Sequence, residues 1–213
     1  MRNKITGLSI LLVSLFFWHC SHLSHKDPTI VNLTVLHTND VHGHAWPLIR
    51  KDGNVRGGYA ALAHLLGKLR KNIEDSGGIS LLLSAGDVNT GIPESDYFSA
   101  EPDFLAMNAM NYDAMTLGNH EFDNGLPQIR KQMEWAKFPI LSANILMQNQ
   151  AIHVLASPYK IIEKKGVKIG ILGLTTDMLT AVVLPSHTKD LTVLNPIKTA
   201  NKALEEMRRE GAE

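Results

Sequence analysis

The sequence has little cysteine, few aromatic residues and no excess of charge of either sign. Cys20 is the only cysteine among 213 residues, which excludes an internal disulfide and a cysteine-rich metal site. Lys and Arg together number 21, and so do Asp and Glu. The chain therefore has no overall electrostatic field that would attract a nucleic-acid polymer, and we expect no such partner.

The sequence also lacks a long hydrophobic run. Its longest apolar stretch, residues 5–18, is too short to cross a bilayer comfortably, but it follows Arg2 and Lys4 as in a secretory signal. Cys20 stands where a bacterial lipoprotein carries its lipid, although residues 17–19 are bulkier than is usual there. We predict that residues 1–20 are a signal peptide, of the lipoprotein or the plain type, and that residues 21–28 are a spacer. The protein would then be exported, either to the periplasm or to a membrane anchored through Cys20 or the N-terminal segment.

Segments typical of strands and helices alternate along the rest of the chain, which predicts an α/β fold. Strands are predicted at residues 30–37, 79–85, 114–117 and 139–143, and a hairpin at 159–162 and 167–174 that turns through 164–166. Helices are predicted at residues 59–73, 104–110, 126–135 and from 196 onward. The last of these places Ile197, Ala200, Leu204 and Met207 on one apolar face.

Three of the predicted strands are each followed by residues of the types that commonly bind metal ions. Asp40 and His42 follow the first strand, Asp87 follows the second, and Asn119 follows the third. The carboxyl ends of strands in an open α/β sheet meet at one crevice, so we expect these side chains to converge. Residues i and i+2 of an extended chain point the same way, which would direct Asp40 and His42 to one ion.

The chemistry of these side chains indicates the kind of metal. The sequence contains ten histidines, and oxygen donors mixed with imidazole suit Zn, Mn, Fe or Co. Asp87, reached from a central strand, is the natural bridge between two such ions. A pair of ions a few ångströms apart activates water near neutral pH and neutralises a phosphoryl group under attack.

Structural explanations compete with the functional one for several residues. An Asn-Asp pair after a strand is commonly just a turn, as at Asp40. His37 is expected to be a satisfied core or sheet residue, and His64 to face solvent. Glu121 is expected to cap a local turn rather than to support a metal ligand.

Two segments resemble signature blocks of the 5′-nucleotidase family, which belongs to the calcineurin-like metallophosphoesterases. They are Leu-His-Thr-Asn-Asp-Val-His-Gly-His at 36–44 and Gly-Asn-His-Glu-Phe-Asp-Asn-Gly at 118–125, with weaker matches at 141–144 and 173–177. The resemblance implies a layered αββα sandwich, of which residues 29–213 would form the N-terminal part of the catalytic domain, with its C-terminal part missing.

The resemblance also implies a role for each site residue. Asp40 and His42 would bind one of two divalent ions, Asp87 would bridge both, and Asn119 would bind the other. His120 would lie beside the scissile phosphate as general acid or transition-state stabiliser, and Asp123 would hold its far ring nitrogen. An imidazolium can give a proton to a leaving alkoxide, and a carboxylate fixes its tautomer.

The implied activity is hydrolysis of a small phosphorylated substrate, foremost a nucleotide. The family completes its metal site with further histidines, and this sequence has no counterpart to them, nor to the second, substrate-binding domain. We therefore expect the isolated chain to bind metal weakly and to show little activity. The alternative is a non-catalytic exported lipoprotein that keeps the fold as an interaction module. The coding sequence beyond codon 213 would distinguish the two, because an open frame with the missing histidines favours the enzyme.

Overall fold

The computed structural model describes residues 30–148 and 153–212, and every element below belongs to the compact unit Val31–Glu213. The predicted signal peptide, Cys20 and the spacer lie outside the described residues. Within the part of the chain that the structure describes, no helix is both long and apolar enough to cross a membrane.

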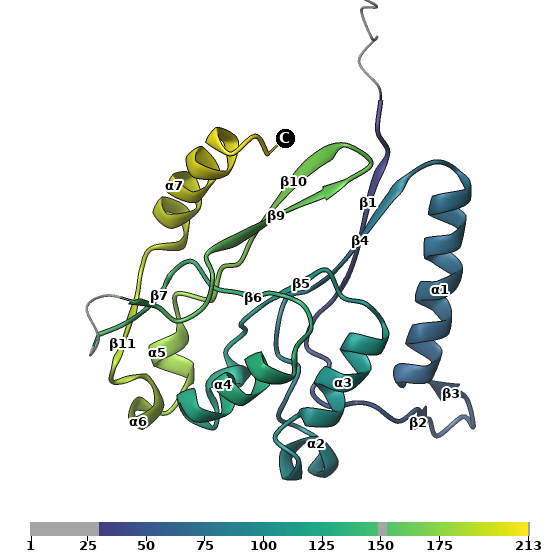
Figure 1. The fold of residues 1–213 in the computed structure, drawn as a ribbon. Helices are drawn as coiled ribbons and strands as arrows, with labels where there is room; N and C mark the ends of the chain where they lie inside the picture. The colour runs from purple at the N-terminus through teal and green to yellow at the C-terminus, as the bar shows by residue number, and fades with distance from the viewer. Residues whose placement is uncertain (1–29, 149–152, 213) are drawn as a thin grey trace, which may run out of the picture. The chain divides into compact units, whose positions relative to one another are not determined.

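A parallel sheet forms the centre of this unit (Figure 1). Its strands, in spatial order, are β1 (Leu33–Thr38), β4 (Ile79–Ser84), β5 (Ala114–Thr116) and β6 (Ile140–Leu141). Side chains of β4 alternate between the two faces, so that Leu82 joins one core cluster and Leu81 the other. A parallel sheet needs apolar cover on both faces, and both are covered here.

Three helices cover the first face of the sheet: α1 (Tyr59–Asp75), α3 (Glu101–Ala109) and α4 (Gly125–Trp135). Leu66 of α1, Phe104 of α3 and Ile129 of α4 are buried in the same cluster as Leu82 and Met115 of the sheet. Complete burial of such a side chain stabilises the fold by about 1.5–3 kcal/mol.

A β-hairpin covers the opposite face. It consists of β9 (Tyr159–Lys164) and β10 (Val167–Leu172), and Ile169 and Ile171 pack against Leu81 of the sheet. Gly170 faces the other way, toward helix α7 (Pro196–Arg209), because a Cβ on Gly170 would lie 2.7 Å from Met207 Sδ. The order of layers is helices, parallel sheet, hairpin and helix, which confirms the predicted αββα arrangement.

Several short elements were not predicted, because two to five residues are too few to show a hydrophobic period. β7 (Ile145–Met147), β8 (His153–Val154) and β11 (Leu191–Val193) form an antiparallel sheet in the order β11-β7-β8. The others are β2 (Leu48–Ile49), β3 (Val55–Arg56), α2 (Pro93–Tyr97), the 3₁₀ turn η1 (His120–Phe122), α5 (Leu179–Val182) and α6 (Pro185–Thr188).

The apolar face predicted for the last helix was wrong in part. Ala203 and Met207 of α7 are buried, whereas Ile197 and Leu204 are 71% and 41% exposed. The hairpin accounts for the difference, because Gly170 leaves a gap that Met207 fills and thereby selects the face of α7 that turns inward.

The structure tests the predicted positions of His37 and His64. His37 lies in β1 as predicted, but its side chain is exposed, because β1 is the edge strand of the sheet. His64 is exposed on α1, as predicted.

Candidate metal centre

The loops that follow β1 and β4 run side by side beyond the carboxyl ends of these strands. Their backbones are joined by hydrogen bonds, so the first loop is held in register with the second. The donor and acceptor pairs are Asp40 N to Gly86 O (3.2 Å), His42 N to Asp87 O (3.1 Å) and Gly43 N to Val88 O (2.8 Å).

Three of the predicted ligands have left-handed backbone conformations. The φ angles of Asp40, His42 and Asp87 are 52°, 49° and 54°. The extended conformation predicted for Asp40 and His42 was therefore wrong, because β1 ends at Thr38, before either residue. The two side chains are neighbours nonetheless, with His42 Nε2 3.9 Å from Asp40 Oδ1. Such conformations cost about 1–3 kcal/mol each in residues other than glycine, and they cluster at functional sites.

His42, Asp87 and His120 come together in one group. Each offers a ligand atom, and these three atoms lie within 4.8 Å of one another. The rings of His42 and His120 meet edge to face, with centroids 4.7 Å apart. One carboxylate and two imidazoles at this spacing fit a divalent transition metal.

The ring of His42 is oriented for ligation. Its Nδ1 lies 2.7 Å from the carbonyl oxygen of Thr90, to which it donates when that nitrogen carries the proton. Nε2 is then left with its lone pair directed away from the backbone. The role of Thr90 could not be predicted from the sequence, because every residue has a backbone carbonyl.

His120 and Asp123 form the predicted pair. His120 Nδ1 is 2.7 Å from Asp123 Oδ2 across one turn of η1. Burial of the ring lowers the pKa of His120, but the hydrogen bond to Asp123 and the negative charges of Asp123 and Asp87 outweigh it, so the pKa lies above the usual 6.5. The protonated ring is thereby favoured.

Asp40 and Asn119, the remaining two predicted ligands, are neighbours in sequence of members of this group. The side chain of Asp40 is 60% exposed, and its Oδ2 accepts a hydrogen bond of 2.6 Å from Asn39 Nδ2. Asn119 is half-buried and directly precedes His120 in the loop after β5. The structure thus assembles His42, Asp87 and His120 and places Asp40 and Asn119 next to them in sequence and fold.

Glu121 does more than cap a local turn, the role that we expected, because it also bonds residues of a distant loop. Its side chain is fully buried, and its carboxylate accepts hydrogen bonds from the backbone of two of the three ligand-bearing loops, those after β4 and β5. Burial raises the pKa of Glu121, while the backbone N–H donors act in the opposite direction. The signal that could have revealed this is an acidic residue next to His120 and Phe122 at the end of a buried strand.

The two weaker sequence matches, at residues 141–144 and 173–177, contact each other through hydrogen bonds. Asn144 Oδ1 accepts from the backbone N–H of Thr175 (2.9 Å), and Asn144 Nδ2 donates to the Thr175 carbonyl (2.8 Å). Thr175 Oγ1 in turn donates to the carbonyl oxygen of Leu117 at 3.0 Å. These buried bonds support the end of β5, from which the loop of Asn119 and His120 departs.

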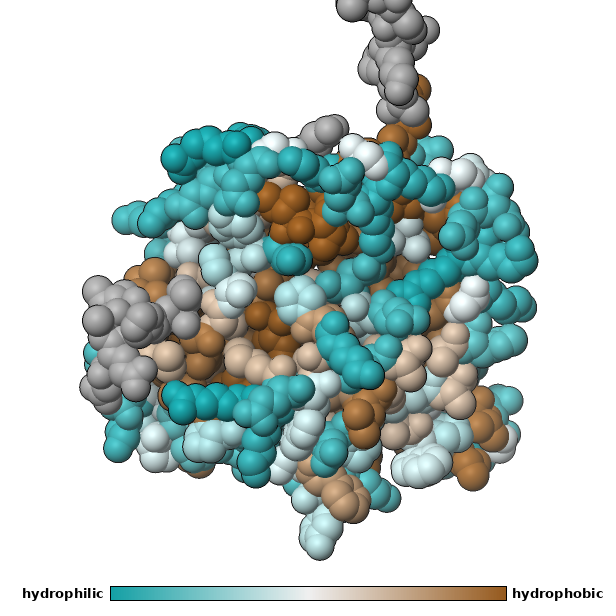
Figure 2. Space-filling view, in the orientation of Figure 1, coloured by the Kyte–Doolittle hydropathy of each residue, from teal (hydrophilic) through white to brown (hydrophobic). Residues whose placement is uncertain are grey.

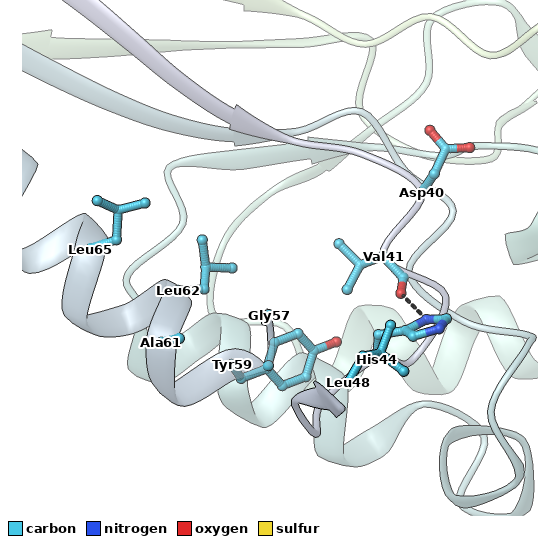
Figure 3. Close-up of a pocket in the computed structure, with 10 residues that line it drawn as sticks. Asp40, Val41, His44, Leu48, Gly57, Tyr59, Ala61, Leu62 and Leu65 are labelled. Carbon is cyan, nitrogen blue, oxygen red and sulfur yellow. Dashed lines mark hydrogen bonds between the residues drawn. The ribbon is translucent and has the colours of Figure 1, made fainter. Parts of the chain in front are cut away.

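A separate pocket of about 600 Å³ lies beside the first loop (Figure 3). Its walls are mainly apolar, with Leu48 of β2 and Leu62 and Leu65 of α1. Asp40 also lines this pocket, and Figure 3 shows its carboxylate pointing away from the leucine side chains. Its surroundings are apolar as well, because Leu48, Ile49 and Val55 of the β2–β3 hairpin are exposed, and Figure 2 shows brown surface at this corner.

Comparison with known proteins decides the family. Residues 33–203 match the calcineurin-like phosphoesterase family. The chain belongs to this family. Protein UshA of Yersinia enterocolitica is 43% identical over 96% of the chain, and the 5′-nucleotidase of Vibrio cholerae is 46% identical over 83% of it.

A solved structure agrees with this calcineurin-like assignment. The 5′-nucleotidase precursor from Thermus thermophilus superposes with a TM-score of 0.74 at 31% identity over 84% of the chain. The chain spans only about a third of each relative, 36% of the Yersinia protein, 31% of the Vibrio protein and 35% of the Thermus chain.

Proposed function

We propose that the chain carries the first part of the active site of a metal-dependent phosphohydrolase acting on phosphate esters, foremost nucleotides. One observation carries the proposal: the side chains of His42, Asp87 and His120, from three separate loops, bring their donor atoms within 4.8 Å of one another, so His120 would lie beside an ion held by His42 and Asp87. Membership of the calcineurin-like phosphoesterases supports the reaction class, and the 5′-nucleotidase of Vibrio cholerae supports the substrate class. Residues 29–213 would be the N-terminal part of the catalytic domain.

The donors fit a pair of divalent ions, Zn, Mn, Fe or Co. We assign Asp40 and His42 to one ion, Asp87 to both, and Asn119 to the other. When bound, such ions would activate water as the nucleophile and neutralise negative charge on the phosphoryl group. Thr90 orients His42 for this role through the contact at Nδ1.

We assign His120 as the general acid. Its Nδ1 faces Asp123, which leaves Nε2 to give a proton to the departing oxygen of the ester. The hydrogen bond to Asp123 and the negative charges nearby raise the pKa of His120, which favours the protonated ring. A positioned general acid typically accelerates such a step by about 10²–10⁴-fold.

Phosphatase assays on two variants test the proposal. AMP and p-nitrophenyl phosphate would be offered, with Mn²⁺ or Zn²⁺, to the 213-residue chain and to any longer product of the same reading frame. We expect Asp87→Ala to abolish turnover and His120→Ala to lower it by about 10²–10⁴-fold. Measurable turnover that is equal in the parent and in both variants would refute the assigned site.

We propose export on the basis of residues 1–20. Fractionation of expressing cells should place the protein in the periplasm or the membrane, and labelling with a radioactive fatty acid should mark it if Cys20 is lipidated. Cys20→Ser is the control that must lose the label. Recovery of uncleaved chain in the cytoplasm alone would contradict export.

A further inference from the structure

Glu121 joins two of the three loops that carry the proposed site residues, those after β4 and β5. Its side chain has 0% exposure, and its carboxylate oxygens accept three backbone hydrogen bonds. Oε2 accepts from Asp87 N at 3.0 Å and from Gly118 N at 2.7 Å, and Oε1 accepts from Val88 N at 2.8 Å. Two of these donors belong to the loop after β4 and the third to the loop after β5.

The loop of Asp87 needs such an acceptor. Asp87 and Gly86 have φ angles of 54° and 93°, a conformation that turns successive N–H groups inward. Val88 is 1% exposed, and its N–H bond to Glu121 is buried, whereas that of Asp87 is partly buried. A buried N–H without a partner costs about 1–3 kcal/mol, and the carboxylate of Glu121 removes this cost at Val88.

The two loops are also in direct contact. A Cβ on Gly118 would lie 2.2 Å from Asp87 Oδ1, and one on Gly86 would lie 2.3 Å from Gly118 N. Asp87 Oδ1 accepts from the backbone N–H of His120 at 2.9 Å. The position of the Asp87 carboxylate therefore depends on the separation of the loops, and Glu121 sets that separation.

We infer that Glu121 is a positioning residue, which holds Asp87 and His120 in register for metal binding without itself touching metal or substrate. This inference rests on the proposed function. Asn89 adds an uncharged hydrogen bond between the same two loops, because its Nδ2 donates to the His120 carbonyl at 2.8 Å. Glu121 bonds the backbone N–H groups of Asp87 and Val88 in one loop and that of Gly118 in the other.

The positioning role of Glu121 requires its carboxylate, and a neutral side chain of the same size would not be sufficient. An ionised carboxylate has acceptors only, whereas the amide of glutamine has one oxygen and an NH₂ donor. In Glu121→Gln at least one of the three backbone N–H groups would therefore meet another N–H. We expect that variant to fold, with its Mn²⁺ affinity lowered about 10–100-fold, the usual effect of losing a group that orients a ligand.

The experiment compares the 213-residue chain with Glu121→Gln, Asp87→Ala and Asp113→Asn. Asp113→Asn is the matched control, since its Oδ2 likewise accepts a backbone N–H, from Leu82 at 2.8 Å, but at the start of β5, away from the ligand loops. Mn²⁺ binding would be followed by the electron paramagnetic resonance of the free ion. Amide hydrogen exchange would follow the backbone, with faster exchange expected at Asp87, Val88 and Gly118 in Glu121→Gln only.

The outcomes separate this inference from the proposed function. If Asp87→Ala loses Mn²⁺ affinity while Glu121→Gln keeps that of the parent, the positioning role is refuted and the metal site stands. If Asp87→Ala binds as the parent does, or the parent binds no Mn²⁺, the proposed site falls and this inference with it. A loss in Asp113→Asn equal to that in Glu121→Gln would show a general loss of stability and would also overturn the positioning role.

Discussion

Close approach of the loops after β4 and β5 leaves no space for a side chain at Gly118. The carboxylate of Asp87 occupies the place where a Cβ would stand, 2.2 Å from Oδ1. The backbone of Gly118 does not itself require glycine, since it has no positive φ, so the restriction is one of space alone. A methyl group there would displace Asp87 from His42 and His120.

Gly118→Ala is predicted to weaken Mn²⁺ binding at least tenfold and to lower the free energy of unfolding by about 1–3 kcal/mol through overpacking. Metal titration and urea denaturation measure the two effects. Gly67→Ala is the control: Gly67 lies within α1 with no atom within 4 Å of its added Cβ. That change should stabilise the chain by about 0.5–1 kcal/mol. Parent-like metal affinity in Gly118→Ala would contradict the described loop contact.

The pair of His120 and Asp123 gives a prediction for pH dependence. NMR titration of the metal-free chain should find the pKa of His120 above 6.5, and Asp123→Asn should lower it, because the hydrogen bond and the charge of Asp123 raise it. The folded-state pKa exceeds the unfolded value, so the pair contributes stability fully below pH 6.5, and this stability is lost as the pH rises through the folded-state pKa. A pKa that does not change in Asp123→Asn would show that the two side chains are not paired in solution.

Among the elements, the β9–β10 hairpin is attached to the sheet at the end opposite to the metal-binding loops. Lys164 Nζ donates to Asp113 Oδ1 at 2.6 Å and to the Ser80 carbonyl at 2.9 Å. Lys165 Nζ donates to the carbonyl oxygen of Gly78 at 2.9 Å. Both lysines were predicted to lie in the turn, whereas Lys164 ends β9 and only Lys165 and Gly166 form the turn, with φ of 52° and 79°.

Lys164→Met is predicted to lower the free energy of unfolding by about 1 kcal/mol, since it breaks a charged hydrogen bond at a partly exposed position. Mn²⁺ affinity should not change, because the hairpin joins the sheet away from the ligand loops. Lys160→Met, at an exposed position of the same strand, should change stability by no more than about 0.5 kcal/mol. Equal effects of the two variants in urea denaturation would show that the bond to Asp113 adds nothing.

At the scale of the whole molecule, the metal-binding group connects segments far apart in sequence. His42, Asp87 and His120 belong to three loops of one sheet, and these loops keep their arrangement only in the folded chain. A ligand that binds only this folded arrangement must stabilise it against unfolding.

Mn²⁺ or Zn²⁺ is therefore predicted to raise the melting temperature of the chain in a concentration-dependent way. The gain is about 2.7 kcal/mol when the free ion is at a hundred times its dissociation constant. Differential scanning calorimetry with and without a chelator measures it, and Asp87→Ala is the control that should show no rise. A melting temperature insensitive to both ions at millimolar concentration would count against a folded metal site.

Local patterns were sufficient for the elements that are long or strongly periodic. The strands β1, β4 and β5, the helices α1 and α4, and the hairpin were predicted within a few residues. Asp40, His42, Asp87, Asn119, His120 and Asp123 were recognised because each stands in a motif that can be read along the chain. The pairing of His120 with Asp123 was implied by the resemblance to the family, and their spacing of three residues is compatible with it.

Contacts between distant segments were decided only by the tertiary structure. The left-handed turns at Asp40 and His42, the carbonyl of Thr90 behind His42 and the three-way bonding of Glu121 depend on loops meeting across the sheet. The face that α7 buries likewise depends on the gap left by Gly170 in a neighbouring strand. Residue types and their spacing thus determined which groups are available for chemistry, whereas packing determined their orientation, because the energy of a buried polar contact depends on both partners at once.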